Sequence, residues 1–111
     1  MYRPESVVAG VKHRLACQPA MSLGQIAADL KVDRHTIARD LRAIEGLTFA
    51  QIRAEIVFAT IDALLIGERP LAVKEFGNEL GCSARVASRW LERHEQWVAR
   101  GRPPARGAAP E

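Results

Sequence analysis

The sequence predicts an all-α protein in which two helix-turn-helix subdomains are bridged by one long central helix. Its composition is 48% hydrophobic and 26% charged but only 5% aromatic, which favours globular helices over strands. Apolar residues recur at the three- and four-residue spacing of amphipathic helices in several separate segments. Two of these segments, about fifty residues apart, repeat one pattern of apolar, small and turn residues, and this internal repeat indicates duplicated units.

Three short helices are expected in the N-terminal part of the chain. Apolar spacing places the first over Glu5–Cys17, before a proline that cannot continue the backbone hydrogen-bond ladder. Ser22 and Asp33 stand where side-chain oxygens would cap the second and third helices, and Gly46 stands where the third would end in a left-handed residue. The side chains expected to face inward are Val7, Val8, Val11, Leu15, Leu23, Ile26, Ala27, Leu30, Ile37, Leu41 and Ile44.

The fourth helix, from Thr48 to about Ile66, is the expected bridge. It would be about 28 Å long at roughly 1.5 Å per residue, and Thr48 and Gln51 have the spacing of a capping box. Because it is apolar on most sides, we expect it to pack on two of them. A fifth helix over Val73–Leu80 and a sixth from Ala84 to about Ala99, capped by Ser83, complete the chain.

These elements divide the chain into four parts. We expect the first helix-turn-helix subdomain over 5–46, the linker helix over 47–67, the second subdomain over 68–99 and a disordered basic tail over 100–111. Within the tail, Arg100-Gly101-Arg102-Pro103 is similar to the core of an AT-hook, an extended basic segment that lies in the minor groove of A·T-rich DNA. A loosely basic tail is the alternative.

The two repeated segments share one register. Each has an apolar residue, a small residue, a second apolar residue, a three-residue turn and then a capped helix, which is typical of a helix-turn-helix unit. The small residue lets the two helices cross closely, and the apolar residue of the turn fills the corner between them. The corresponding residues are Ile26, Ala27, Leu30, Val32, Ile37 and Leu41 in the first unit, and Phe76, Gly77, Leu80, Cys82, Ala87 and Leu91 in the second.

Arginine is the commonest residue on the expected outward faces of the third and sixth helices. Its guanidinium pairs bidentately with guanine and also binds phosphate, so these faces are candidate DNA-binding surfaces; the alternative is a solvated face of good helix formers. Trp90 and His94 are expected on the inner face of the sixth helix, and Trp97 at its end. The candidate DNA-binding residues are Arg34, His35, Thr36, Arg39, Arg42, Ala84, Arg85, Ser88, Arg89 and Arg93, with Arg100 and Arg102 in the tail.

The arrangement resembles the DNA-binding domain of the AraC/XylS family of bacterial transcription regulators over roughly Val7 to Arg93. The resemblance lies in Leu23-Gly24-Gln25-Ile26-Ala27-Ala28 and Ile37-Ala38-Arg39-Asp40-Leu41, in Gly46-Leu47-Thr48-Phe49, in the pair Leu64-Leu65, and in Val73-Lys74-Glu75-Phe76-Gly77 with Leu80-Gly81. It implies a bilobed domain that places its third and sixth helices in successive major grooves on one face of DNA.

Other classes of function lack their sequence signatures. No nucleophile–base set and no glycine-rich phosphate loop can be assembled by spacing, so no enzyme and no cofactor are expected. Cys17 and Cys82 lack metal-ligand spacing and are expected to be reduced thiols, so no metal is expected. No apolar run reaches the roughly twenty residues of a membrane span, and a cytoplasmic, nucleoid-associated protein is expected.

The sequence therefore predicts a sequence-specific binder of double-stranded DNA that acts as a transcription regulator and reads two successive major grooves. The net charge of +3 suits a polyanionic partner. RNA polymerase or a partner regulator is a further candidate partner, and a monomer is expected, with the oligomeric state left open. Two alternatives remain: the DNA-recognition module of a recombinase, transposase or phage protein, and a helical protein-interaction module that does not contact DNA.

Overall fold

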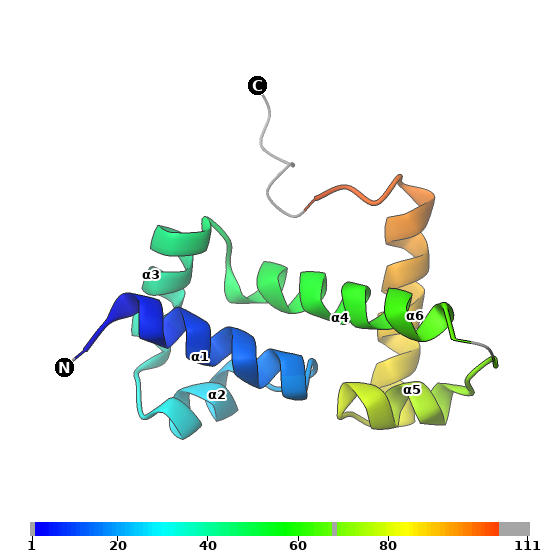
Figure 1. Cartoon of the computed structure of the whole chain (residues 1–111), viewed down its shortest axis with the longest axis horizontal. Coiled ribbons are helices and arrows are strands. Elements are labelled where there is room, and N and C mark those ends of the chain that lie inside the picture. The colour runs from blue at the N-terminus through cyan, green and yellow to red at the C-terminus, as the bar shows by residue number, and fades with distance from the viewer. Residues whose placement is uncertain (1, 68, 105–111) are drawn as a thin grey trace.

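The computed structural model describes residues 2–67 and 69–104, and this part of the chain forms six helices without a strand. The all-α prediction is therefore confirmed. Figure 1 shows the long helix α4 joining an N-terminal group of three helices to a C-terminal pair. The helices are α1 (Pro4–Cys17), α2 (Leu23–Leu30), α3 (Arg34–Glu45), α4 (Phe49–Leu65), α5 (Val73–Leu80) and α6 (Ala84–Ala99).

Short polar side chains start most of these helices, at the predicted positions. The hydroxyl of Ser22 accepts a hydrogen bond from the backbone of Gln25 at 3.1 Å, and the carboxylate of Asp33 accepts one from the backbone of His35 at 2.7 Å. Each cap satisfies a backbone N–H that has no partner inside its helix. Thr48 and Gln51 form the full capping box, and Ser83 caps α6. These local signals explain why the predicted and observed boundaries agree within two residues.

Two separate hydrophobic cores share α4. Phe49 and Ile52, in its first turns, pack into the core of α1, α2 and α3. Val57, Phe58 and Ile61, further along, pack into the core of α5 and α6. The expected two-sided packing of the central helix is thus confirmed, and each half of α4 is part of a different core.

The helix pairs α2–α3 and α5–α6 turn in the same way. In the first pair the backbone N–H of Val32 donates to the carbonyl of Ala27 at 3.1 Å, and in the second Cys82 donates to Gly77 at 2.9 Å. The residue after each first helix is left-handed: Lys31 has φ +56° and Gly81 has φ +76°. The repeat seen in the sequence is therefore also a repeat of backbone geometry.

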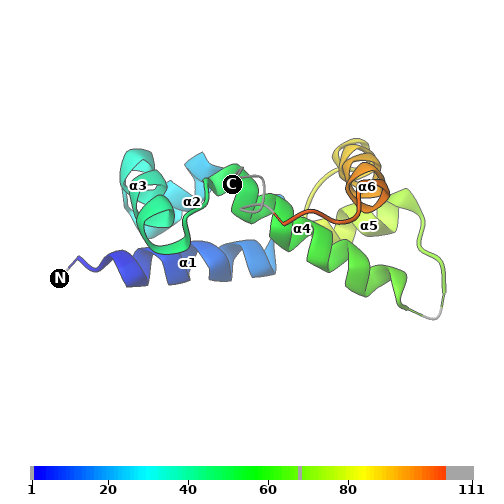
Figure 2. The ribbon, with the colours of Figure 1, turned by 90° about the horizontal axis from the view of Figure 1, so that it is seen from above.

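Both α3 and α6 lie on the same side of α4. Figure 2, which shows the molecule from above, places them together on the side of α4 opposite α1. In Figure 1 both run upward, so their N-terminal turns point the same way. The described fold extends over 46 × 37 × 22 Å, and its long dimension separates the two helices.

Two sequence expectations about burial and order need correction. Ile44 was expected on the inner stripe of α3 but is 43% exposed. It lies in the last turn of α3, where Leu47, just beyond the helix, is buried in the core. On the same helix Asp40 is only 2% exposed, and its carboxylate accepts a hydrogen bond from Tyr2 at the start of the chain.

The second correction concerns the start of the expected disordered tail. Residues 100–104, here called the C-terminal strap, fold back against α6, with Gly101 at φ +87° and the backbone N–H of Arg102 donating to the carbonyl of Trp97 at 2.9 Å. The indole of Trp97 donates to the carbonyl of Pro103 at 2.9 Å. The rest of the expected tail, 105–111, and the expected boundary at Glu68 lie outside the described residues.

Replacing Ile61 with Ala should lower the free energy of unfolding by about 2–4 kcal/mol, because a fully buried branched side chain would leave a cavity. Urea unfolding followed by circular dichroism measures the change. Leu65→Ala is the control on the same helix: Leu65 is 58% exposed, so its loss should cost less than about 0.5 kcal/mol. Equal costs for the two variants would contradict the assignment of Ile61 to the second core.

Replacing Gly77 with Ala should destabilise the fold by about 1–3 kcal/mol through overpacking. A Cβ at position 77 would stand 2.8 Å from the carbonyl oxygen of Cys82, which is backbone and cannot swing aside. Gly24→Ala is the matched control, since a Cβ there meets nothing within 4 Å and removing glycine from a helix stabilises by roughly 0.5–1 kcal/mol. Thermal unfolding should move in opposite directions for the two variants.

Candidate nucleic-acid interface

The outward face of α3 carries the first group of expected DNA-binding residues. Arg34, His35 and Arg42 are exposed there, and Thr36 is half-buried. The guanidinium of Arg34 has no ion-pair partner within residues 2–67 and 69–104. The first turn of α3, where backbone N–H groups and the positive end of the helix dipole point outward, is thus flanked by free basic side chains.

Arg39, in the middle of the same face, is held by a short chain of hydrogen bonds. Its Nη2 donates to the hydroxyl of Tyr2 at 2.8 Å, and its Nε lies 3.4 Å from a carboxylate oxygen of Asp40. The Tyr2 hydroxyl in turn donates to the buried carboxylate of Asp40. The Arg39 side chain is still 66% exposed, so its guanidinium is oriented but remains accessible.

Tyr2 is a candidate interface residue that the sequence did not indicate. It lies thirty-eight positions from Asp40 along the chain, and only the packing of α1 against α3 brings the two together. The apolar spacing of the helix did not single out Asp40 either. The signal that could have found it is an acidic residue at an inward position of an amphipathic helix, which requires a buried partner.

The outward face of α6 carries the second group. Ala84, Arg85, Ser88 and Arg89 are all exposed, and the guanidinium groups of Arg85 and Arg89 have no ion-pair partner in the described parts of the chain. Arg93 is exposed as expected, but its guanidinium lies over the ring of Trp90, 4.2 Å from the centroid. The first turns of α6 therefore present arginines in the same way as those of α3.

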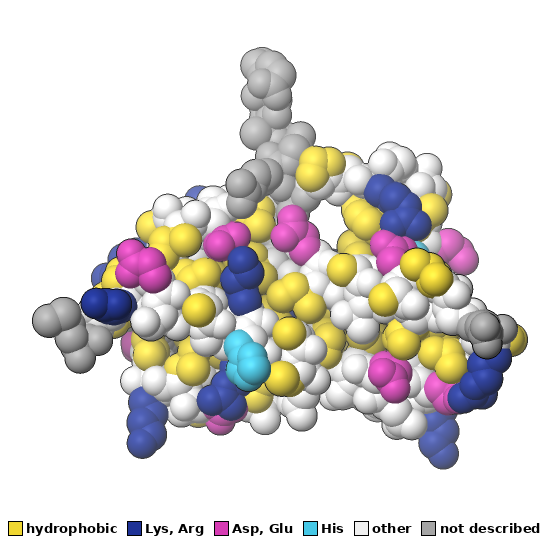
Figure 3. Space-filling model, in the orientation of Figure 1, with side chains coloured by type: hydrophobic (Ala, Val, Ile, Leu, Met, Phe, Trp, Pro, Cys, Tyr) yellow, Lys and Arg dark blue, Asp and Glu magenta, His cyan; other side chains and the backbone are white. Residues whose placement is uncertain are grey.

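The structure brings the two groups to one side of the molecule, because α3 and α6 lie on the same side of α4 (Figure 2). The opposite side, drawn in Figure 3, carries basic, acidic and hydrophobic side chains intermixed. A surface led by arginine on two aligned helices can bind phosphate and guanine at two separated places. This face is the candidate nucleic-acid interface.

The tail arginines are placed differently from the sequence expectation. Arg102 has φ +56° and its Nη1 forms an ion pair with Asp62 at 2.7 Å, while Nε of Arg100 donates to the carbonyl of Gln96 at 3.3 Å. The segment is therefore folded, whereas the AT-hook interpretation needs an extended backbone. The ion pair with Arg102, followed by a hydrogen bond from His94, lowers the pKa of Asp62.

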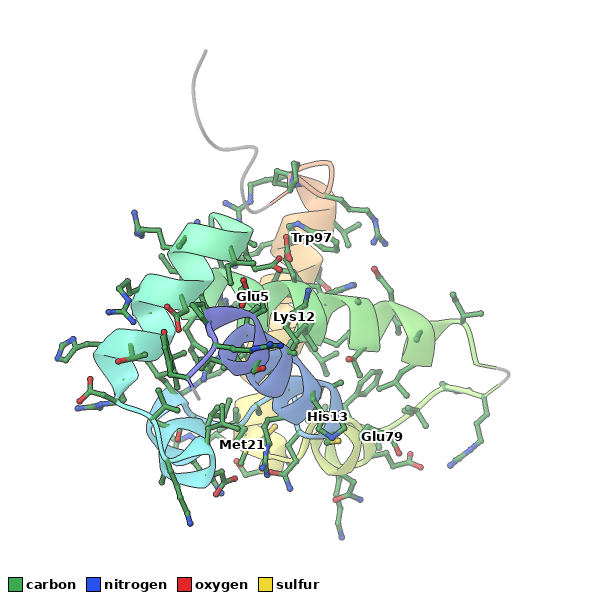
Figure 4. All side chains as sticks on the ribbon, turned by 60° about the vertical axis from the view of Figure 1, so that its left-hand side comes forward. Glu5, Lys12, His13, Met21, Glu79 and Trp97 are labelled. Atoms are coloured by element: carbon green, nitrogen blue, oxygen red, sulfur yellow. The ribbon has the colours of Figure 1, made fainter. Side chains whose placement is uncertain are left out.

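Aromatic side chains anchor the strap and the end of α6. The ring of Trp97 stacks on Phe58 of α4 at 4.8 Å between centroids, and the guanidinium of Arg102 lies 5.0 Å from the Trp97 centroid. Figure 4 labels Trp97 at the end of α6. Nε2 of His94 is 2.8 Å from Asp62, which confirms His94 as a satisfied inner-face residue. An open cavity of about 400 Å³ lies beside them, lined by residues that include Ala54, Glu55, Phe58, Arg93, Trp97 and Pro103.

Arg53 is a second residue that the sequence analysis did not single out. It projects from α4 between the two cores, with its guanidinium 5.5 Å from the ring of Phe49 and 5.7 Å from that of Trp90. Its Nε is buried and has no hydrogen-bond partner in the described chain. Burial, followed by repulsion from Arg93, lowers the pKa of Arg53. A cationic side chain in the first half of a mostly apolar helix was the available signal.

Metal ligation, cysteine pairing and membrane spanning can each be examined in the described residues. No three His, Cys, Asp or Glu side chains there are grouped as metal ligands would be, and the thiols of Cys17 and Cys82 are unpaired. None of the helices described is both long and apolar enough to cross a membrane. Comparison with models of known protein families, with curated proteins and with solved structures finds no match.

The contact between Tyr2 and Asp40 predicts the titration of the only tyrosine in the chain. The hydrogen bond to Asp40 is the largest cause that raises the pKa of Tyr2 above its ordinary value of 10.0. Absorbance at about 295 nm should therefore show ionisation above that pH, and Asp40→Ala should move the midpoint back towards it. Because the folded-state pKa is raised, the contact stabilises the fold below pH 10.0 and is lost as the pH rises through the raised pKa. Equal midpoints in the two proteins would contradict the contact.

Proposed function

We propose that this protein is a sequence-specific binder of double-stranded DNA that acts as a transcription regulator, with α3 and α6 in successive major grooves on one face of the duplex. The observation that carries the proposal is the repeated helix pair, whose second helices lie aligned on one side of α4 with arginine-led outward faces. A capped second helix that presents its first turns outward is the DNA-reading element of a helix-turn-helix unit.

The dimensions and charge are consistent with two-groove binding. Successive major grooves on one face of B-DNA are about 34 Å apart. The seventeen-residue helix α4 is about 26 Å long at roughly 1.5 Å per residue, and the helix pairs at its ends extend the described fold to 46 Å. The net charge of +3 favours association with the phosphate backbone.

The resemblance to the AraC/XylS DNA-binding domain implies the same two-groove arrangement and supports the assignment to transcription regulation. Under this proposal the protein reads its site through Arg39 on α3 and Arg89 on α6, while Arg34, Arg42 and Arg85 bind phosphates around them. The hydrogen bonds that Arg39 donates to Tyr2 and Asp40 would lower the entropy cost of fixing its guanidinium against a base edge.

A selection of bound sequences from a random duplex pool, followed by footprinting, tests the proposal. We expect protection of two major grooves about ten base pairs apart on one face. A helical protein-interaction module would enrich no duplex and show no salt-dependent binding. A recombinase or transposase module would also bind duplexes, and its cognate site would be expected at element ends rather than at promoters.

Arg39→Ala and Arg89→Ala should each weaken binding to the selected site by about 1–3 kcal/mol and relax specificity at a single base pair, the two positions lying about ten base pairs apart. Competition binding against single-base variants of the site measures both effects. Lys12→Ala is the control: Lys12 lies on α1 (Figure 4), where it pairs with Glu45 at the end of α3 at 3.4 Å and is not one of the outward arginines, so specificity should stay unchanged. Wild-type binding by Arg89→Ala, with a footprint in one groove, would remove α6 from the proposed mechanism.

A further inference from the structure

Two arginines meet at the junction of the two cores without an acidic partner. Arg53 on α4 and Arg93 on α6 both place their guanidinium groups within 5.7 Å of the centroid of the Trp90 ring. Neither forms an ion pair with any Asp or Glu of the described residues. They are close enough that repulsion from Arg93 is one of the two causes that lower the pKa of Arg53. The junction therefore holds uncompensated positive charge.

The environment of Arg53 makes this arrangement costly for the fold alone. Its Nε–H has lost contact with water without gaining an acceptor, and a buried donor left without a partner destabilises a fold. The flanking rings of Phe49 and Trp90 lie within 5.7 Å of the guanidinium, and their cation–π attraction offsets part of this destabilisation. An oxyanion would accept hydrogen bonds from both guanidinium groups and relieve their mutual repulsion.

The position of the pair identifies which oxyanion can reach it. Arg53 projects from α4 towards Trp90 of α6, which is the side of α4 where α3 and α6 lie. If those helices occupy successive major grooves, the backbone strands that border the intervening minor groove pass in front of the middle of α4. A phosphate there carries the charge and the paired oxygens that match the fork of a guanidinium.

From these contacts we infer that Arg53 and Arg93 form a phosphate-binding site for the DNA backbone between the two grooves. The site rests on the proposed function, which it deepens by adding a third point of attachment at the centre of the interface. Arg93, which the sequence placed among the groove-reading residues, belongs to this central site because it stacks on Trp90. Arg53 supplies a guanidinium whose Nε–H lacks a hydrogen-bond partner within the described fold.

Arg53→Met tests the site, with Lys12→Met as the control that removes one positive charge from the side of α1 (Figure 4). Binding to the selected duplex is measured from about 50 to 300 mM salt. Losing one phosphate contact should lower the slope of log K against log salt by about 0.9 and weaken binding about tenfold near 0.1 M salt, equally for all sequences. Arg53→Lys keeps the charge and should retain a slope near that of the wild type. Lys12→Met should leave the slope unchanged.

The same duplex with single neutral methylphosphonates locates the contact. We expect one substitution beside the central minor groove to weaken the wild type about tenfold and to leave Arg53→Met unaffected, because that contact is already lost. The Tm of Arg53→Met should equal or exceed that of the wild type, since an orphan donor and a repulsion are removed together.

The outcomes separate this inference from the proposed function. If the wild type enriches no duplex, the proposed function itself fails. If it binds two grooves but Arg53→Met keeps the wild-type slope and the wild-type sensitivity to every methylphosphonate, the central phosphate site is wrong and two-groove binding stands. A lower Tm with an unchanged slope likewise overturns the site and leaves Arg53 as a packing residue between the cores.

Discussion

The arrangement of this protein depends on one helix being buried in two cores at once. Phe49 and Ile52 fix the start of α4 against α1, α2 and α3, while Val57, Phe58 and Ile61 fix its remainder against α5 and α6. A helix is rigid over this length, so the angular offset between these two sets of side chains sets the angle between the two helix pairs. If either set moved to another face of α4, α3 and α6 would no longer share a side. Reading two grooves at a fixed separation requires this constraint.

Each half of the molecule contains an aspartate that organises the arginines near it. Asp40 lies on α3 and holds Tyr2 together with Arg39, so the arginine that it orients stays on the candidate interface. Asp62 lies on α4 and accepts from both His94 and Arg102. Because Asp62 belongs to the bridging helix, its ion pair draws an arginine of the strap onto the fold. Asp40 thus keeps an arginine on the candidate interface, whereas Asp62 holds an arginine against the fold.

Two local departures from ideal helix chemistry lie beside features that the proposed function uses, while a third, the positive φ of Arg102, lies in the strap. Lys31 is left-handed at the turn before α3, where the equivalent turn before α6 has Gly81. Arg53 retains a buried donor without a partner at the junction of the cores. Such conflicts between local preference and global fold persist where another requirement opposes stability. In both cases the affected residue adjoins a surface that we assign to DNA.

The sequence by itself determined the elements of this protein. Cap residues such as Ser22, Asp33 and Thr48 and the left-handed Gly46 act over three or four positions, so short-range pattern was enough to place the helices. Apolar periodicity likewise identified both cores and most outward arginines. The tertiary structure decided the partners of the charged side chains: the contact of Arg39 with Tyr2, that of Arg102 with Asp62, and the position of Arg53 beside Arg93. These contacts depend on how helices that are distant in the sequence pack together. A long side chain can reach several partners, and no local pattern specifies which of them it contacts.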